Sequence, residues 1–313
     1  MITTLKKFDF RKNIVYVGVV LIFIFFSIFL SSKGFTSGSN LLNILRQSSI
    51  IVVMAMAMTF VIGAAEIDLS VGSIAGLSSV CTAMAIANYG IIPGVLAGLA
   101  VGIMCGFVNG FLVAFARIPS FLVTLAMMGV AVGIAQWITA SAPQPILNQS
   151  YNFIFGGGDI GEFPVLIIWA LVFLVFGVLV LSRTRFGKYT LAVGANPIAA
   201  NYSGIKVPRI RFAVMMASSV CAAIAGMLYA GRLQSGRYQW GNGDEMNVIA
   251  AVILGGTALS GGRGSAAGAA AGAVLMAMIN NGLVLAGLSS PQQQVVRGII
   301  IVLAVVLAKR SDD

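Results

Sequence analysis

Residues 62–76 read IGAAEIDLSVGSIAG, a polar, glycine-containing break between two long apolar runs. The flanking runs cover about 44–63 and 70–88. Each is about as long as the 20 helical residues that cross the ~30 Å hydrocarbon core of a bilayer. Irregular backbone at membrane depth is tolerated only where protein covers it or where it lines a water-filled path. The stretch therefore predicts a helical membrane protein with a polar feature between two of its spans.

The composition excludes most other classes of protein. Of the 313 residues, 59% are hydrophobic and 9% are charged, whereas soluble domains have roughly 25% charged residues. So few charges cannot cover a soluble globular protein, and the hydrophobicity excludes a disordered chain. The chain contains no His, which excludes imidazole-based zinc sites and the Ser-His-Asp triad. Because no nucleophile–base pair or metal cluster is evident, we expect neither an enzyme nor a metal site.

The apolar runs predict an all-α bundle of about ten transmembrane helices in a single domain, residues 1–313. We place the spans near 14–31, 44–63, 70–88, 91–116, 119–140, 164–182, 212–231, 246–262, 265–286 and 292–308. The third and eighth are short and interrupted by glycine. Many glycines recur at small-xxx-small spacing, such as Gly94, Gly98 and Gly102. In lipid, this spacing lets helix backbones approach closely, so it predicts a tight bundle.

The basic residues predict the orientation of this bundle. With ten spans and a cytoplasmic N-terminus, fourteen of the 19 Lys and Arg residues fall on the inner side. The other five, Lys33, Arg46, Arg232, Arg237 and Arg297, fall on the outer side. This distribution satisfies the positive-inside rule and predicts that both termini are cytoplasmic. The net charge of +10 is therefore explained by topology, without a nucleic-acid partner.

Two acidic residues, Glu66 and Asp68, lie beside the broken span, whereas Asp244, Glu245 and the remaining acids are expected in loops or tails. A charge at the bilayer centre costs roughly 2.5–3.5 kcal/mol on insertion scales. Residues two apart on a helix point about 200° away from each other, which disfavours a catalytic carboxylate pair. Asp68 and Ser70 are both suitable N-caps for the following span. Capping and a direct role in gating or solute passage both remain open.

A second glycine-rich stretch, residues 254–268 (LGGTALSGGRGSAAG), shares five identical positions with residues 62–76. In a Gly- and Ala-rich chain this is weak evidence of duplication. It does predict a second apolar span followed by a glycine-rich break. Intramembrane amides, including Asn280 and Asn281, are more often hydrogen-bonded between helices than used as ligands.

Residues 183–211 form the longest predicted cytoplasmic loop and contain a helix signal. Asn196 is a good N-cap, Pro197 suits the first helical position, and Gly204 suits a left-handed stop. Two turns of helix are not stable alone in water. The segment therefore needs a surface to dock against, which is a cytoplasmic partner or the inner surface of the bundle itself. The residues between the cap and the stop are Pro197, Ile198, Ala199, Ala200, Asn201, Tyr202 and Ser203.

The loop does not contain an ATP-binding motif. The nearest match to a P-loop, GKYT at residues 187–190, lacks the upstream glycine and the adjacent Ser or Thr. The protein is therefore not expected to hydrolyse ATP itself.

Three segments together resemble the permeases of ribose-type sugar ABC importers. They are EIDLSVGS at residues 66–73, the inner loop from Arg185 to Ile205, and IAAVILGGTALSGGRG at residues 249–264, which is followed by Asn280 and Asn281. Their order and spacing cover nearly the whole chain. The family pattern has Gly where this chain has Glu66.

The resemblance implies a type II importer fold in the bacterial inner membrane. It implies that a second permease copy, identical or paralogous, faces this one, and that the path runs along their interface. A periplasmic binding protein delivers a ribose-like pentose, a hexose or a sugar-like solute. A cytoplasmic subunit binds ATP and Mg, so the permease itself needs no cofactor. By position, the path or gate residues are Glu66, Asp68, Ser70, Ser73, Gly255, Gly256, Thr257, Asn280 and Asn281. The ATPase coupling helix contains Asn196, Pro197, Ala199, Ala200, Tyr202, Ser203 and Gly204.

The alternative is an ion-coupled secondary transporter of a small polar solute that uses Glu66 and Asp68. The absence of His and the presence of only two candidate intramembrane acids disfavour it. The two hypotheses differ in the energy source that drives uptake.

Overall fold

The predicted helical membrane bundle is confirmed by a computed structural model of the chain. The structure describes the backbone of residues 10–310 and the side chains of residues 15–300 and 302. Lys6 and Lys7, which the charge count assigns to the inner side, lie outside the described residues. The same holds for the side chains of Arg11, Lys12, Lys309 and Arg310.

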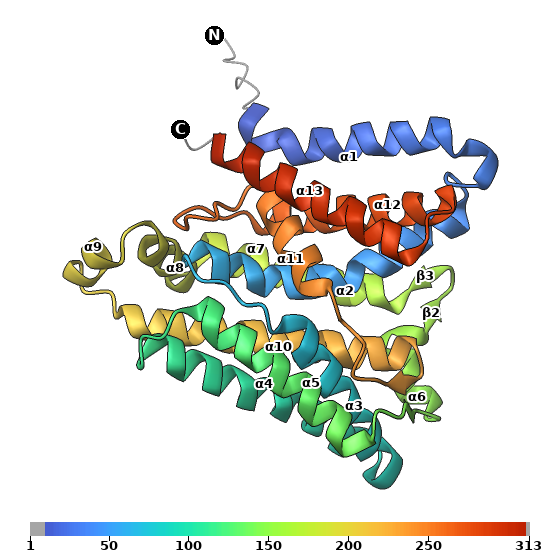
Figure 1. Cartoon of the computed structure of the whole chain (residues 1–313), viewed down its shortest axis with the longest axis horizontal. Coiled ribbons are helices and arrows are strands. Elements are labelled where there is room, and N and C mark those ends of the chain that lie inside the picture. Colours follow the sequence, from blue (N-terminus) through green and yellow to red (C-terminus); the bar gives the residue numbers. More distant parts are fainter. Residues whose placement is uncertain (1–9, 311–313) are drawn as a thin grey trace.

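The elements follow one another in the order that the apolar runs predict, with additional short elements in the connections (Figure 1). They are α1 (Phe10–Phe29), η1 (Ser31–Lys33), α2 (Gly38–Gly63), α3 (Val71–Tyr89), α4 (Ile91–Ala114), α5 (Ser120–Thr139), β1 (Gln144–Pro145), α6 (Gln149–Asn152), η2 (Phe153–Gly157), β2 (Asp159–Ile160), β3 (Phe163–Pro164), α7 (Val165–Arg183), α8 (Arg185–Ala195), α9 (Pro197–Tyr202), α10 (Val207–Arg232), β4 (Ser235–Gly236), α11 (Asp244–Leu254), α12 (Ala266–Ala286) and α13 (Ser290–Arg310).

Seven of the described helices are long and apolar enough to cross a membrane: α2, α3, α4, α5, α7, α10 and α12. Helices α1 and α13 have 20 and 21 residues, which corresponds to about 30 Å of helix. These nine helices correspond to nine of the ten predicted spans. Helix α8, which the loop prediction for residues 183–211 does not include, is an additional helix of 11 residues.

The eighth predicted span, residues 246–262, is wrong as a continuous helix. Helix α11 has only 11 residues, about 16 Å, and ends before Gly255 and Gly256, the second of which has a φ of +89°. The chain instead crosses the bundle here as α11 together with the preceding segment 233–243. This segment runs antiparallel to α3, with Gly241 against Gly72 and Gly236 against Ser79. Figure 1 shows this coil leading into α11. Hydrophobic periodicity does not predict this crossing, because only its second half, α11, is helical.

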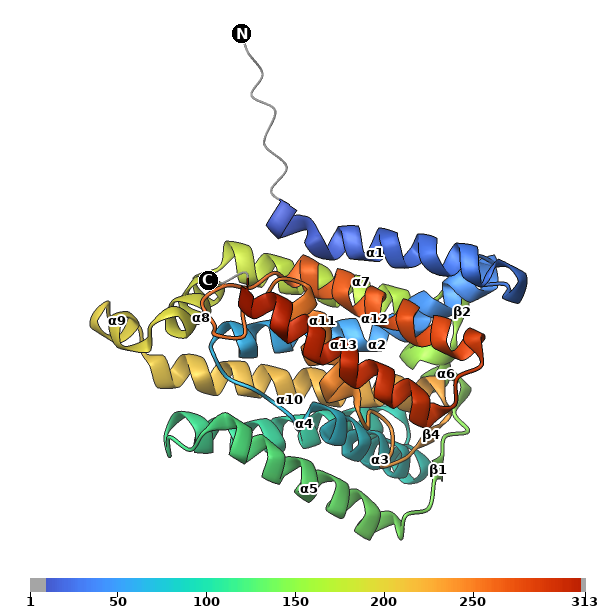
Figure 2. The same ribbon diagram turned by 45° about the horizontal axis from the view of Figure 1, so that its top comes forward.

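The bundle has two distinct ends (Figures 1 and 2). The start of α1 and the end of α13 lie at the end that also holds α8 and α9. The two short sheets lie at the opposite end. One pairs β1 with β4, and the other pairs β2 with β3, both antiparallel. Both ends of the described chain are therefore on the side of the basic loop, as an even number of passages requires.

The core is centred on α10, which packs against α2, α3 and α4. The predicted small-residue spacing on α4 lets α4 and α10 approach closely. A Cβ atom on Gly102 would lie only 2.7 Å from the Cβ of Ala223 on α10. The outward faces of α4, α5 and α7 are largely exposed and apolar. In a membrane protein such faces are covered by lipid or by another helix.

Two glycines let segment 233–243 cross α3 backbone to backbone. A Cβ on Gly72 would overlap the carbonyl oxygen of Gly241, and one on Gly241 would lie 2.7 Å from the carbonyl oxygen of Gly72. Nearby, Ser79 Oγ donates to the Arg237 carbonyl oxygen at 3.0 Å and accepts from the Arg237 amide at 3.1 Å. These contacts satisfy the backbone groups of Arg237, in a segment that consists mostly of turns.

We expect Gly72→Ala to destabilise the protein by about 1–3 kcal/mol, because the added methyl group must displace backbone rather than a flexible side chain. The measurement is the thermal unfolding midpoint of the purified protein in detergent. Gly129→Ala on α5 is the matched control, since a Cβ there meets nothing within 4 Å. Equal midpoints for the two variants would contradict the close crossing.

Candidate translocation and docking sites

The predicted break between α2 and α3 is an extended segment, residues 64–70, that enters the bundle from the end that holds α8. Ala65 has a φ of +61°, a left-handed conformation that glycine adopts more easily. Two hydroxyls at the start of α5 hold the segment. Ser120 Oγ accepts from the Ile67 amide, and Thr124 Oγ1 accepts from the Leu69 amide, both at 3.1 Å.

Glu66 forms an ion pair near the α2 end of this segment. Its Oε1 lies 2.8 Å from Nε of Arg211, near the start of α10. Glu66 is only 8% exposed. The pair therefore joins the α2–α3 connection to α10.

Asp68 is fully buried and organises a polar cluster deeper in the bundle. Its Oδ1 accepts from the amide and the hydroxyl of Ser70, at 2.9 and 2.5 Å. Asn109 of α4 donates to Ser70 Oγ at 3.1 Å. Ser70 occupies the N-cap position of α3 but caps no amide with its side chain. Asp68 thus fixes the turn before α3 rather than capping the helix directly as the sequence suggested.

The second predicted group, Gly255, Gly256 and Thr257, lies in the loop between α11 and α12. Gly255 packs against Gly268, and Thr257 Oγ1 accepts from the Ser265 amide at 3.3 Å, which closes the loop on itself. The loop also reaches the first group, because the Gly262 amide donates to the Gly63 carbonyl at 3.0 Å. The two glycine-rich breaks therefore meet at the end where α8 lies.

Asn280 and Asn281 lie elsewhere, toward the opposite end of α12. Asn281 and Asn40 of α2 exchange two hydrogen bonds of 2.8 and 3.0 Å. Asn40 also donates to the carbonyl of Phe35 at 2.8 Å. Asn281 thus joins two helices, which is the use that the sequence suggests for intramembrane amides.

The structure reveals a polar hollow that the sequence analysis did not identify. It is lined by Ser73 of α3, Met128 and Val132 of α5, Tyr238 and Asn242 of segment 233–243, and Glu245 of α11. Of the predicted path residues, Ser73 is the one that lines it. Glu245 is on the first turn of α11 and not in a loop or tail as predicted. The glycine-flanked sequence GNGDE at residues 241–245 is a helix-start signal that could have indicated this.

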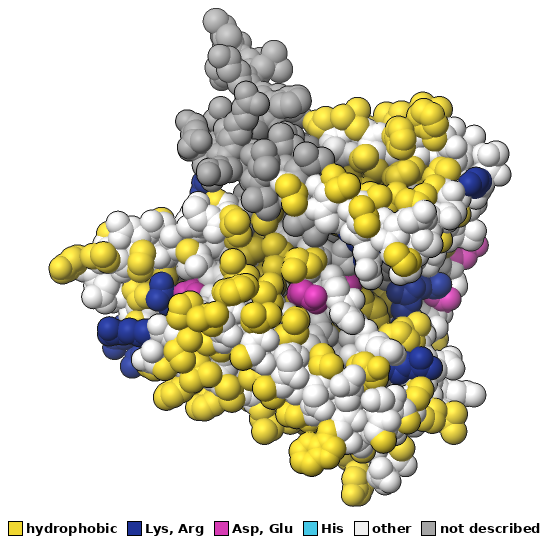
Figure 3. Space-filling model, viewed as in Figure 1, with side chains coloured by type: hydrophobic (Ala, Val, Ile, Leu, Met, Phe, Trp, Pro, Cys, Tyr) yellow, Lys and Arg dark blue, Asp and Glu magenta, His cyan; other side chains and the backbone are white. Residues whose placement is uncertain are grey.

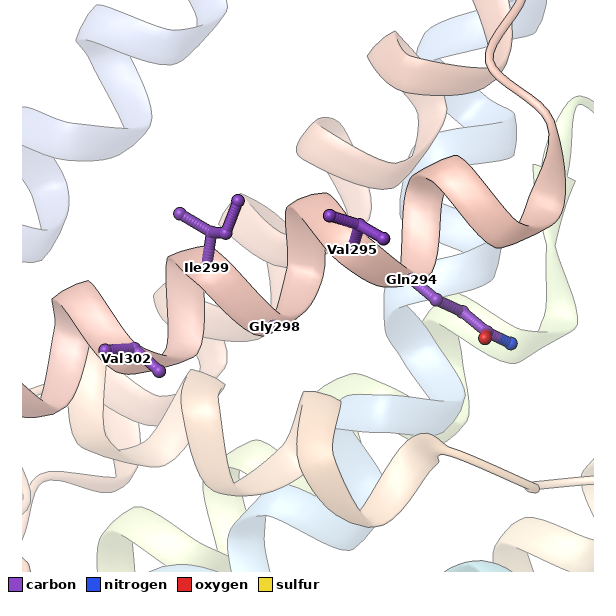
Figure 4. Close-up of a pocket in the computed structure, with 5 residues that line it drawn as sticks. All are labelled: Gln294, Val295, Gly298, Ile299 and Val302. Atoms are coloured by element: carbon purple, nitrogen blue, oxygen red, sulfur yellow. The ribbon is translucent and has the colours of Figure 1, made fainter.

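Figure 3 shows the face of the bundle that contains α5 and α13. Acidic side chains are visible near its middle, surrounded by apolar ones, and basic side chains lie mostly toward the two ends. A second hollow on this face is apolar except for one amide (Figure 4). It is lined by Gln294, Val295, Gly298, Ile299 and Val302, all from α13. The apolar lining suits another helix or lipid rather than a polar solute.

The predicted short helix of the basic loop is confirmed as α9. Asn196 Oδ1 accepts from the amides of Ile198 and Ala199, each at 3.0 Å, and Pro197 is the first helical residue. Gly204 has a φ of +84° and ends the turn. Ala200 is buried, whereas Ile198 and Tyr202 are 69% and 88% exposed. Helix α9 therefore presents an apolar and an aromatic side chain outward at the end of the bundle.

Comparisons with known proteins agree with this arrangement. A model of the family described as branched-chain amino acid transport system / permease component matches residues 40–305. The chain is 41% identical to the probable ABC transporter permease protein YphD of Escherichia coli K12, over 96% of this chain and 91% of that protein. It is 40% identical to the ribose import permease protein RbsC of Bacillus subtilis, with 95% and 92% covered. It is 31% identical to the xylose transport system permease protein XylH of E. coli K12, with 96% and 92% covered.

The helical bundle, the predicted sequence segments and the comparisons all indicate one kind of protein. The family match covers most of the chain, and the alignments with these relatives cover at least 91% of each chain. The protein belongs to the branched-chain amino acid transport system permease component family and is a membrane-spanning transport subunit of an ABC importer, not an enzyme.

Proposed function

We propose that this permease forms the membrane path through which an ATP-driven importer moves a monosaccharide, a ribose-like pentose or a hexose, or a sugar-like solute. The observation that supports the substrate class is the 40% identity to a ribose import permease over almost the full length of both chains. A cytoplasmic ATPase and a solute-binding protein are the partners that an ABC importer permease requires. ATP and Mg are bound by the ATPase, so this chain needs no cofactor.

The proposed assembly contains two permeases that face each other, either identical or paralogous. The face with α5 and α13 suits this arrangement because it combines a polar hollow with exposed apolar helix surfaces. A second copy against this face would cover the apolar surfaces and enclose the polar groups in a path. The proposed path or gate elements are the Glu66–Ser73 segment and the hollow beside it.

The proposed orientation places α8, α9 and both termini in the cytoplasm of a bacterium. The positive-inside distribution of Lys and Arg supports it. The same orientation places α9 where a cytoplasmic ATPase can reach it. We propose that α9 is the coupling helix, with Ile198 and Tyr202 as its contact side chains.

Reconstituted in vesicles with its ATPase and binding protein, the permease is expected to take up labelled ribose or xylose only when ATP is supplied. Uptake should persist after an uncoupler collapses the ion gradient, because the ATPase drives the conformational change. The measurement is radiolabel retained per vesicle. Uptake that survives ATP depletion and stops with the uncoupler would support the ion-coupled alternative instead.

Tyr202→Ala is expected to weaken binding of the ATPase at least tenfold, since exposed aromatic side chains often dominate protein interfaces. The measurement is the amount of ATPase that co-purifies with the tagged permease. Tyr89→Ala is the matched control, because Tyr89 is also highly exposed, at 75%, but ends α3 at the opposite end of the bundle. If both variants retain the ATPase equally, α9 is not the coupling helix.

Glu66→Gln is expected to slow uptake several-fold without loss of ATPase binding. The reason is that the Glu66–Arg211 ion pair joins the extended segment 64–70 to α10. Arg211→Gln should have the same effect, and the double variant should be no slower than either single variant, since both remove one interaction. Vesicle uptake and ATPase co-purification are the measurements. If Glu66→Gln takes up the solute at the wild-type rate, Glu66 has only a structural role.

A further inference from the structure

The polar hollow lies at the middle of the bundle rather than at either end. Met128 and Val132 are the ninth and thirteenth of the 20 residues of α5, so they occupy the middle of that span. The hollow has a volume of about 90 Å³. Complete ligand pockets typically measure about 300–1,000 Å³, so the hollow can contact only part of a solute.

The exposed surface of the hollow is mostly apolar, but its lining includes several polar side chains. Four of its six residues, Ser73, Tyr238, Asn242 and Glu245, have side chains with hydrogen-bonding groups. A polar or ionisable group at this depth is costly and usually indicates a path for a solute or ion. Ser73 Oγ already donates to the Ser70 carbonyl at 2.8 Å, and the Tyr238 hydroxyl accepts from Gln239 at 3.3 Å. Asn242 and Glu245 are therefore the lining groups considered for a solute.

Glu245 is the second residue of α11, and its side chain lies against the first turn of α3. One carboxylate oxygen lies against Gly72, where a Cβ would come within 2.5 Å of it. The glycine on α3 therefore leaves the space that the carboxylate occupies. Arg237, the basic residue of the same segment, lies over the Trp240 ring at 5.4 Å.

The residue types around Glu245 match the chemistry of a sugar. A carboxylate is an acceptor with about four lone-pair positions, and the Asn242 amide both donates and accepts. Together they can bind neighbouring hydroxyl groups, which each donate and accept. The Tyr238 ring and the apolar Met128 and Val132 side chains offer surfaces for the C–H groups of the solute.

A metal ion fits this site less well. The described residues contain no group of three His, Cys, Asp or Glu side chains that could hold one. Glu245 is the one acidic residue in the lining of the hollow.

We propose that the hollow is a contact site for a polyhydroxylated solute on its way through the membrane, with Glu245 and Asn242 as the groups that bind its hydroxyls. The site rests on the proposed function, because it assigns a solute contact to the path of an importer. It adds a contribution of the permease to solute selection, beyond that of the binding protein. Contact at this point is brief, since a solute that bound tightly would block transport.

Glu245→Gln tests the assignment, because the amide keeps the shape of the carboxylate but replaces one acceptor oxygen with a donor. The same binding protein and ATPase are used with every variant in vesicles, so any change belongs to the permease. We expect ribose uptake to fall about tenfold, the usual loss when a hydrogen bond to a charged group is removed. Uptake of 2-deoxyribose, which has one hydroxyl fewer, should fall less, so the ratio of the two rates should change.

Glu162→Gln is the matched control, because Glu162 is exposed in the turn between β2 and β3. Asn242→Ala is the second variant. Its side chain is exposed to the hollow in the isolated subunit, so truncation should leave folding and ATPase co-purification intact. We expect Asn242→Ala to lower ribose uptake and change the same ratio.

The possible outcomes separate the two proposals. If the wild type and Glu162→Gln both transport ribose with ATP, and Glu245→Gln and Asn242→Ala do so at the same rate and ratio, the contact site is wrong and the importer function stands. If wild type and Glu162→Gln show no ATP-driven sugar uptake, the proposed substrate class is wrong. If Glu245→Gln fails to assemble, Asn242→Ala alone decides: an unchanged ratio overturns the site, and a changed ratio supports it.

Discussion

The close backbone crossing of Gly72 and Gly241 is the constraint on which the rest of the central structure depends. It lets segment 233–243 enter the bundle without being helical, and hydrogen bonds to Ser79 satisfy the backbone groups of Arg237. The crossing also brings the first turns of α3 and α11 together in the middle of the bundle. Larger side chains at either glycine would separate them, and the polar hollow between them would lose its shape.

The polar groups of the bundle divide into those that bond to one another in its core and those that line the hollow. Asp68, Ser70 and Asn109 hydrogen-bond to one another and fix the turn before α3, although Asp68 Oδ2 and Asn109 Oδ1 have no hydrogen-bond partner among the described residues. Glu66 pairs with Arg211, and Asn281 pairs with Asn40. Such contacts between polar groups of different elements stabilise one arrangement of helices. The side chains around Glu245 are instead arranged on a surface, which is why they, rather than the more deeply buried Asp68, suit contact with a solute.

Much of the bundle could be predicted from the sequence because lipid imposes one strong rule, that a spanning segment be long, apolar and helical. Nine passages and α9 follow from apolar length and from the cap at Asn196. The rule fails for residues 233–254, because the first half of this stretch is built of turns and a two-residue strand instead of a helix. For the same reason, the sequence predicts Glu245 in a loop, whereas it lies on the first turn of α11. Its position depends on where Gly241 meets Gly72, a contact between residues 169 positions apart that local patterns do not encode.

The two ends of the extended segment 64–70 suggest how a change at α9 can reach the middle of the bundle. At the α2 end, the Gly63 carbonyl accepts from Gly262, and Gly194 of α8 packs against the same carbonyl. Helix α9 follows α8 directly, so displacement of α9 by a partner would act on this junction of three backbones. From there, the extended segment leads through the Glu66 ion pair to α3, whose first turn borders the hollow. Because packed backbones at glycine contacts cannot deform gradually, such a junction favours discrete rearrangement of α3 relative to α10 over continuous bending.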